Sequence, residues 1–233
     1  MRFKRFIRAL TALMVVAISL AGAMMFSTPA MADSPTYHQT YQINASEYDA
    51  YESYCIIPHF THYMMMGSHE LYVVEDPSGC GDFAGAKNSG LVFRGIEEPT
   101  GTDVRLVNAS IALYITYGTQ ARMRIYGENN SSAVDYGLSP INGRPLVDTY
   151  AEFSDDISVG SWAYFNITPV VNEMITSSNW SNGGNMGFIL VWAWADTEFR
   201  FCAYDGNPAH APMLILDYSS TPIVPQSPVS AMM

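Results

Sequence analysis

The sequence predicts an all-β protein, an antiparallel β-sandwich with one short helix. Short segments rich in Val, Ile, Leu, Tyr and Phe recur along the chain, and segments rich in Gly, Pro, Asn and Ser separate them. Several of the apolar segments alternate apolar with polar residues, which is the pattern of a strand with one buried face. Only the stretch 168–177 combines a helix start signal with helical spacing. Many short strands with a single helix favour a sandwich over a helical or α/β fold.

Residues 1–32 have the composition of a secretory signal peptide. Four basic residues lie within the first eight positions, an apolar run covers 9–25, and Ala30-Met31-Ala32 matches the small-x-small pattern that signal peptidase recognises. We therefore expect cleavage after Ala32, with an uncleaved membrane anchor as the alternative. No later run approaches the about 18 apolar residues that a membrane helix needs. The protein is expected to be secreted, extracellular or at the cell surface, and not embedded in a membrane.

The chain after residue 32 is strongly acidic. The first 32 residues contain four of the eleven basic residues and none of the 22 acidic ones, so the remaining 201 residues carry a formal charge of −15. Such a charge disfavours nucleic acid and anionic surfaces as partners, because phosphate binding needs clustered Lys and Arg. It suits a soluble extracellular protein, including one that collects divalent cations.

Three cysteines, Cys55, Cys80 and Cys202, follow the signal peptide, and an odd number leaves one thiol unpaired in an oxidising compartment. We expect a disulfide between Cys55 and Cys80, because the strands around them can be neighbours that close a loop of moderate length. Cys202 is most simply a buried small hydrophobic residue. Pairings that involve Cys202, and an intermolecular disulfide, remain open alternatives.

The sandwich domain is expected at residues 55–218. Before it, residues 33–54 are polar and rich in Tyr, which fits a flexible N-terminal arm or an edge strand. After it, residues 219–233 have the Pro- and Ser-rich composition of a tail. Within the domain, apolar or alternating segments predict strands at 70–74, 91–94, 104–117, 121–127, 147–153, 161–165, 186–194, 199–204 and 212–218.

The predicted helix begins at Thr168 and Pro169. Thr is a favourable N-cap, and Pro suits the first helical position because its missing N–H would have no partner there. The helix is expected to end near residue 177. Its buried stripe is expected to consist of Val170, Val171 and Met174.

Four motifs occur in a fixed order between residues 67 and 218. The first is Leu91-Val92-Phe93 with the turn at 98–101 and the strand that contains Ala109, Ile111 and Leu113; the second is Ile125-Tyr126-Gly127-Glu128. The third is Trp162 with Phe165-Asn166-Ile167-Thr168 and Val171; the fourth is Gly187-Phe188 with Ala211-Pro212-Met213-Leu214. Together these motifs resemble a divergent member of the secreted β-sandwich family named for its DNRLRE motif, which is grouped with carbohydrate-binding modules.

The resemblance implies a jelly-roll-like sandwich that serves as a non-catalytic module in surface and extracellular proteins. It also implies that Trp162 occupies a core position, because a Trp stands at that place in the family signature. The DNRLRE string itself does not occur in this sequence.

Three tryptophans, Trp180, Trp192 and Trp194, are the candidate carbohydrate-binding residues. Trp192 and Trp194 lie two apart in a predicted strand and so share one face of it, and exposed rings on one face form a platform for sugar rings. The same face carries Phe188 and Leu190, which favours the alternative that it is core. Trp180 lies in a Ser- and Asn-rich turn, where it is either exposed to ligand or caps the edge of the sandwich.

Glu75, Asp76 and Asp82 lie in one Gly-rich loop and are the candidate metal ligands. Ca²⁺ takes six to eight oxygen ligands, which carboxylates and carbonyls of such a loop can supply. Solvated acidic side chains with no metal are the alternative. Asp196, Glu198 and Asp205 give a second, weaker option, so Ca²⁺ is a candidate cofactor.

No nucleophile elbow, zinc-protease helix or glycosidase carboxylate pair is recognisable in the sequence, so we expect no enzyme. The leading hypothesis is a secreted, non-catalytic β-sandwich that binds polysaccharide at the cell surface or in extracellular matrix. The alternative is a self-assembling extracellular structural or filament subunit, whose Tyr-rich arm adds a strand to a neighbour's sheet. A secreted hydrolase or lyase, with carboxylates assembled from distant loops, is the third hypothesis.

Overall fold

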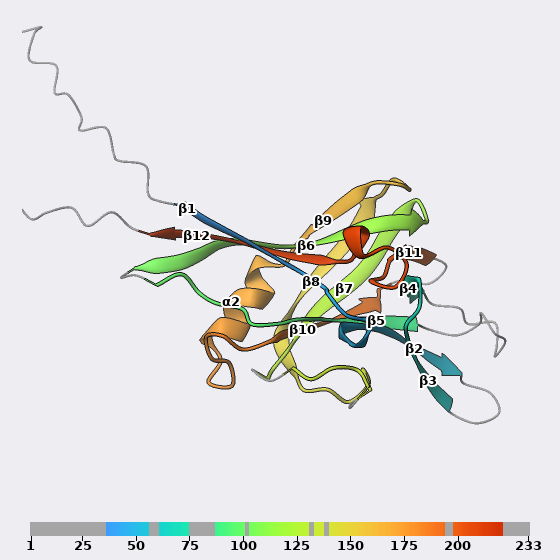
Figure 1. The fold of residues 1–233 in the computed structure, drawn as a ribbon, viewed down its shortest axis with the longest axis horizontal. Coiled ribbons are helices and arrows are strands. Elements are labelled where there is room, and N and C mark those ends of the chain that lie inside the picture. Colours follow the sequence, from blue (N-terminus) through green and yellow to red (C-terminus); the bar gives the residue numbers. More distant parts are fainter. Residues whose placement is uncertain are drawn as a thin grey trace, which may run out of the picture. The chain divides into compact units, whose positions relative to one another are not determined.

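A computed structural model describes residues 36–55, 61–74, 87–100, 103–130, 133–137, 140–193 and 198–220. These residues form one compact unit of strands and short helices (Figure 1). The strands are β1 (Thr36–Gln42), β2 (Asp49–Cys55), β3 (Thr61–Met66), β4 (Glu70–Val74), β5 (Lys87–Phe93), β6 (Val104–Tyr117), β7 (Gln120–Glu128), β8 (Leu146–Asp156), β9 (Trp162–Asn166), β10 (Met186–Trp192), β11 (Glu198–Cys202) and β12 (Met213–Ser220). The helices are the 3-10 turns η1 (Ser46–Tyr48) and η2 (Pro208–His210) and the α-helix α2 (Thr168–Thr176).

The strands are hydrogen-bonded in one continuous, curled sheet. Its order is β1-β12-β6-β11-β4-β5-β10-β7-β8, with β9 also paired to β6, β2 to β5, and β3 to β2. All these pairings are antiparallel, so the expected antiparallel all-β fold with one short α-helix is confirmed. The described pairings do not divide into the two separate sheets of the expected sandwich. The sheet stays continuous through β11, which pairs with β6 only at Arg200 and Phe201, with a register shift between them.

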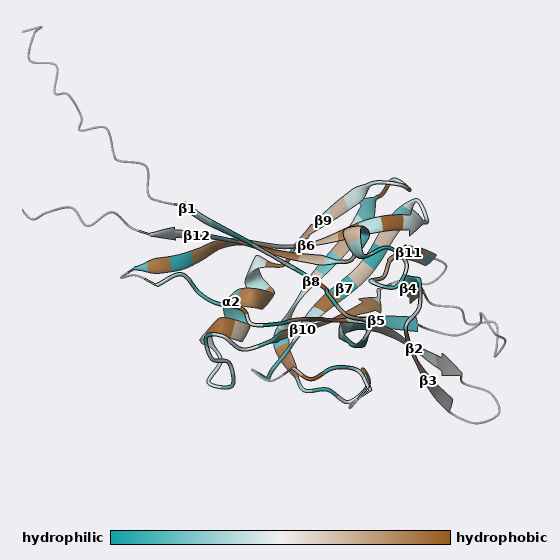
Figure 2. Cartoon of the chain, viewed as in Figure 1, coloured by the Kyte–Doolittle hydropathy of each residue, from teal (hydrophilic) through white to brown (hydrophobic). Residues whose placement is uncertain are grey.

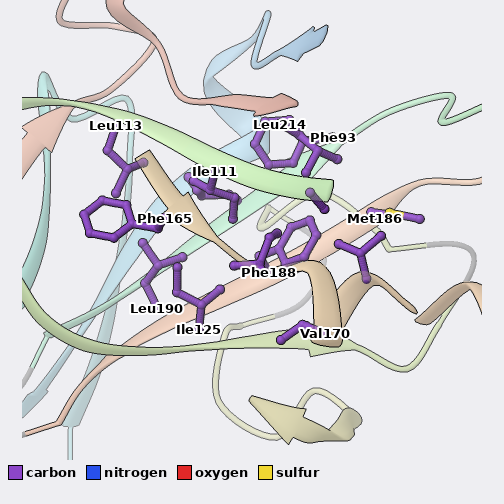
Figure 3. Packing of buried hydrophobic residues seen from close by; sticks show 14 of the residues in the cluster. Phe93, Ile111, Leu113, Ile125, Phe165, Val170, Met186, Phe188, Leu190 and Leu214 are labelled. Carbon is purple, nitrogen blue, oxygen red and sulfur yellow. The ribbon is translucent and has the colours of Figure 1, made fainter. Parts of the chain in front are cut away.

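Because the sheet is curled, strands that are far apart in the strand order surround one hydrophobic core. Leu113 of β6, Leu214 of β12 and Phe188 of β10 are fully buried members of the same cluster. Figure 3 shows these side chains converging with Phe165 of β9 and Ile125 of β7. The core follows from the alternating sequence, because apolar residues alternate with polar ones along β6 and β7 (Figure 2).

Helix α2 packs its predicted stripe into this core. Val170, Val171 and Met174 are its buried residues, as expected from helical spacing. A side chain at Gly127 of β7 would overlap Met174, so this glycine permits the close approach of strand and helix.

The start of α2 differs from the prediction in its cap. The N-cap is Ile167, without a capping side chain, and Pro169 lies in the first turn. The Thr168 hydroxyl instead accepts a hydrogen bond from the backbone N–H of Ala109 in β6, at 2.9 Å. The Asn166 side chain accepts a hydrogen bond from the Thr168 N–H at 3.0 Å, so a residue of β9 satisfies a backbone donor at the start of the helix.

Residues 36–42 of the N-terminal segment form a strand at the edge of the sheet, which was the alternative to a flexible arm. Strand β1 pairs with β12 at seven consecutive positions, from Thr36 with Ser219 to Gln42 with Met213. The chain then continues through η1 into β2, which pairs with β5 inside the sheet. Among the described residues, no helix is long and apolar enough to span a membrane.

Candidate functional site

One face of the strands β9, β6, β12 and β1 is turned away from the core. Residues paired across antiparallel strands lie on the same face, and that face alternates along each strand. Because Phe165 and Leu214 point into the core, their sequence neighbours Tyr164 and Met213 lie on the opposite face. Both are register partners of Ala112 in β6, so one continuous outer face runs across these strands.

An aromatic cluster, defined as Tyr114, Trp162, Tyr164 and His210, lies at one end of this face. The His210 ring stacks on the Tyr114 ring with centroids 3.8 Å apart and planes inclined by 7°. The Trp162 ring stands nearly perpendicular to both, at 5.6 Å from Tyr114 and 6.1 Å from His210. Tyr164 is 61% exposed. The rings of Tyr114, Trp162 and His210 therefore contact one another, and the exposed Tyr164 ring lies two residues from Trp162 on the same face of β9.

A polar ladder, defined as Asn166, Asn108, Asp217, His38 and Thr40, crosses the same face further along the strands. The Asn166 amide donates to Asn108 at 3.1 Å, and the Asn108 amide donates to Asp217 at 3.0 Å. His38 Nδ1 lies 2.6 Å from the other Asp217 oxygen, and His38 Nε2 lies 3.3 Å from the Thr40 hydroxyl. One side chain from each of β9, β6 and β12 and two from β1 thus form a single hydrogen-bonded row.

Asp217 is the electrostatic centre of the ladder. Partial burial would raise the pKa of its carboxyl, but the hydrogen bonds from Asn108 and His38 outweigh that effect, and the pKa lies below the ordinary Asp value. Asp217 is therefore ionised at neutral pH and only accepts hydrogen bonds, which fixes His38 Nδ1 as a donor.

A cavity of about 240 Å³ adjoins the aromatic cluster between the end of β8 and β9. Trp162 and Tyr164 line one side of it, and Asp155 and Asp156 line another. The cavity therefore combines aromatic surface with carboxylate oxygens, a lining that suits a polar, hydroxyl-bearing group.

The structure places two of the three predicted carbohydrate-binding tryptophans against the main core. Trp180 and Trp192 are both partly buried and pack on that cluster. The Trp180 indole N–H is buried and finds no hydrogen-bond partner among the described residues. Trp194 lies outside the described residues. A role of these three residues in sugar binding stays a prediction.

Trp162 differs from what the family resemblance implies. It is only partly buried and contacts Tyr114 and His210 on the outer face, whereas its neighbour Phe165 fills the core. Its position follows from strand alternation, because Phe165 points inward and Trp162 lies an odd number of residues away. The same alternation places Asn108, Ser110 and Tyr114 on one side of the strand 104–117. This pattern is the signal in the sequence that could have identified the outer face.

The predicted metal ligands Glu75, Asp76 and Asp82 lie outside the described residues, so Ca²⁺ binding by this loop stays a prediction. Within the part of the chain that the structure describes, no group of three or more His, Cys, Asp or Glu side chains is placed to hold a metal ion. Of the weaker candidates, Glu198 forms an ion pair with Arg200, and Asp205 accepts a hydrogen bond from Ser46 at 2.8 Å.

The cysteine predictions have separate outcomes. Cys202 is buried and forms no disulfide, as expected for a small core residue. Its thiol contacts the carbonyl oxygens of Ala203 and Asn207. The Cys80 residue and the Cys55 side chain lie outside the described residues, so the predicted disulfide between them stays a prediction.

A second polar cluster is buried under the segment 133–145, of which residues 133–137 and 140–145 are described. These residues pack on the side of β2, β5 and β10 that faces away from the main core. Arg144 and Glu128 form an ion pair at 2.7 Å with both side chains only 3% exposed. The Arg144 guanidinium also donates to the carbonyl oxygens of Val134, Asp135 and Pro140, and lies 4.2 Å from the centre of the Tyr136 ring. Arg144 therefore fastens this segment to the sheet.

Two further buried carboxylates, Glu52 and Asp49, accept hydrogen bonds from backbone N–H groups of loops. Glu52 accepts a hydrogen bond from the Asn142 N–H at 2.7 Å, and Asp49 accepts one from the Tyr204 N–H at 2.7 Å. Burial raises the pKa of Asp49 to about 7, with a further upward effect from the Asp205 charge that the bond from Tyr204 opposes. These contacts join loops to strands, so we interpret both carboxylates as structural.

Comparison with known proteins adds no family to these observations. No protein-family model matches the chain, and no curated protein is similar to it. The resemblance to the DNRLRE family therefore stays a prediction.

Proposed function

We propose that this protein is a secreted, non-catalytic module that binds polysaccharide through the outer face of β9, β6, β12 and β1. The observation that carries the proposal is the aromatic cluster, whose Trp162 and Tyr164 rings lie on a strand face turned away from the core. The apolar C–H faces of sugar rings pack on aromatic rings, and a strand face holds such rings at fixed spacing.

The charge of the chain narrows the class of polysaccharide. The formal net charge is −11 for the whole sequence, and the cavity beside the cluster is lined by Asp155 and Asp156. Anionic glycans are repelled by such a surface. The proposed ligand is therefore a polysaccharide without carboxylate or sulfate groups.

The proposal is tested by replacing single rings and measuring glycan affinity. Burying about 60 Å² of ring surface is worth about 1.5 kcal/mol at 25 cal/mol per Å², which corresponds to roughly a tenfold change in affinity. Trp162→Ala and Tyr164→Ala are each expected to weaken binding by about that factor, as measured by calorimetry on a glycan panel. Tyr150→Ala on β8 is the matched control, because Tyr150 is similarly exposed, at 44%, but lies outside the face.

The outcomes separate the candidate functions. Equal loss in Tyr150→Ala would show a general surface effect and contradict the assignment of the face. No binding to any neutral glycan would contradict the function itself.

A self-assembling subunit is the second candidate function, and one observation favours it. Strand β1 pairs with β12 on one side, and no described strand pairs with its other side. Such an open edge can accept a strand from another molecule. A sizing run beside the glycan panel checks this candidate, because assembly through β1 gives large particles whether or not glycan is present.

A further inference from the structure

The residues of the polar ladder form a continuous hydrogen-bonded row although several of them are exposed to solvent. The His38 side chain is 64% exposed, and Asn166 and Thr40 are also exposed, so water is available to each of them. They nevertheless form one row in which every described member contacts the next. Holding exposed polar side chains in one geometry costs rotamer entropy, and surface contacts of this kind return little stability.

Ordered side chains with unused hydrogen-bonding capacity are what a ligand with many hydroxyl groups requires. Among the described residues, the Asn166 amide donates one of its two hydrogens, to Asn108, and each Asp217 oxygen accepts one of the two hydrogen bonds it can accept. Because the row is already fixed, a hydroxyl that binds there loses less entropy than it would with mobile side chains.

Trp162 lies too far from the ladder for both to contact the same sugar ring. Trp162 and Asn166 are four residues apart on β9, which places them about 13 Å apart along the strand. Between Trp162 and Asn166 the face carries Tyr164 of β9 with its register partner Ala112 of β6, which in turn pairs with Met213 of β12. Ala112 is fully buried and Tyr164 is 61% exposed, so an elongated ligand that reaches from Trp162 to Asn166 passes the Tyr164 ring.

We propose that the polar ladder is a second subsite of the same binding face, and that the ligand is a linear neutral polysaccharide chain that runs along β9 and β6 from the aromatic cluster to the ladder. This inference rests on the proposed function. The aromatic cluster binds one sugar ring by stacking, and the ladder binds hydroxyl groups of a later ring. Affinity therefore increases with chain length until a chain spans both features.

The test compares short and long ligands. The probes are the disaccharides and hexasaccharides of β-linked glucose, mannose, xylose and N-acetylglucosamine, measured by calorimetry on the purified protein. His38→Ala removes the contact to Asp217 at one end of the ladder. Asn166→Asp removes the donor at the other end but keeps an oxygen that accepts from the Thr168 N–H. Thr36→Ala, on β1 beyond the ladder, is the matched control.

We expect the hexasaccharide to bind about tenfold more tightly than the disaccharide, since one or two added hydrogen bonds correspond to about that factor. His38→Ala and Asn166→Asp are expected to remove this gain and to leave disaccharide affinity and Thr36→Ala unchanged. Equal affinity for both lengths, or equal weakening of both by the ladder variants, would overturn the inference. In that case disaccharide binding that depends on Trp162 would still support the proposed function, whereas no binding of any probe would overturn both.

Discussion

Replacing Arg144 tests whether the buried ion pair fastens the segment 133–145 to the sheet. In Arg144→Ala the Glu128 carboxylate stays buried without its cationic partner, and three backbone carbonyl oxygens lose a donor. Removing one partner of a buried pair costs about 3–5 kcal/mol, which is a large part of the about 5–15 kcal/mol that stabilises a typical domain. Arg124→Ala is the matched control, because the Arg124–Glu152 pair is about one-third exposed and solvent-exposed pairs contribute little to stability.

The pH dependence sharpens the same prediction. Burial raises the pKa of Glu128, and the charge and hydrogen bond of Arg144 lower it in part. Without Arg144 the pKa rises further, so the folded protein binds a proton that the unfolded chain releases above the ordinary Glu value of 4.5. The loss of stability in Arg144→Ala therefore grows as the pH rises above 4.5 and shrinks as the pH falls toward that value.

Urea unfolding at pH 8 and pH 5 measures both effects on the free energy of unfolding. A cost of Arg144→Ala no larger than that of Arg124→Ala at pH 8 would refute the reasoning, as would a cost that grows on acidification. The variant Glu128→Gln/Arg144→Met removes both charges and is expected to recover part of the loss.

Two other substitutions test the packing of this region. The Asp49 pKa is raised from 3.8 to about 7, so between these values the folded state holds a proton that the unfolded state has lost, and stability falls as the pH rises through that window. Asp49→Asn is expected to flatten this pH dependence, as measured by urea unfolding at pH 4 to 8. An unchanged dependence in the variant would show that other groups cause it. Gly90→Ala is expected to destabilise the protein by about 1–3 kcal/mol, because the added Cβ would overlap the Tyr136 ring. The shift in the thermal unfolding midpoint measures this destabilisation. The double variant Gly90→Ala/Tyr136→Leu should restore most of the lost stability.

The fold was largely predictable, because it depends on local patterns. Strand alternation predicted β6 at 104–117 with its bounds, and helical spacing predicted the buried residues of α2. The pairing of strands was not predictable in the same way, because it depends on contacts between distant segments. Residues 36–42 contain no aliphatic residue, and they form a strand through their backbone pairing with β12.

The candidate site was harder to predict from sequence for a related reason. Tryptophan is the most conspicuous residue for sugar binding, yet strand alternation and the register decide which rings are exposed. The ladder residues are common polar residues taken from 38, 40, 108, 166 and 217, and only the register of four strands brings them together. For example, nothing in the sequence around Asn108 distinguishes it from other asparagines in the chain.

The segment 133–145 has a consequence for solubility as well as for stability. It shields a second hydrophobic cluster on the outside of the curled sheet, in which Ala50, Val92 and Ile189 pack against Ala133, Tyr136 and Ile141. If this segment were lost or displaced, a contiguous apolar surface of three neighbouring strands would face solvent, and such surfaces promote aggregation. The Arg144–Glu128 ion pair therefore contributes to stability and also to solubility, because it holds this segment over the apolar surface.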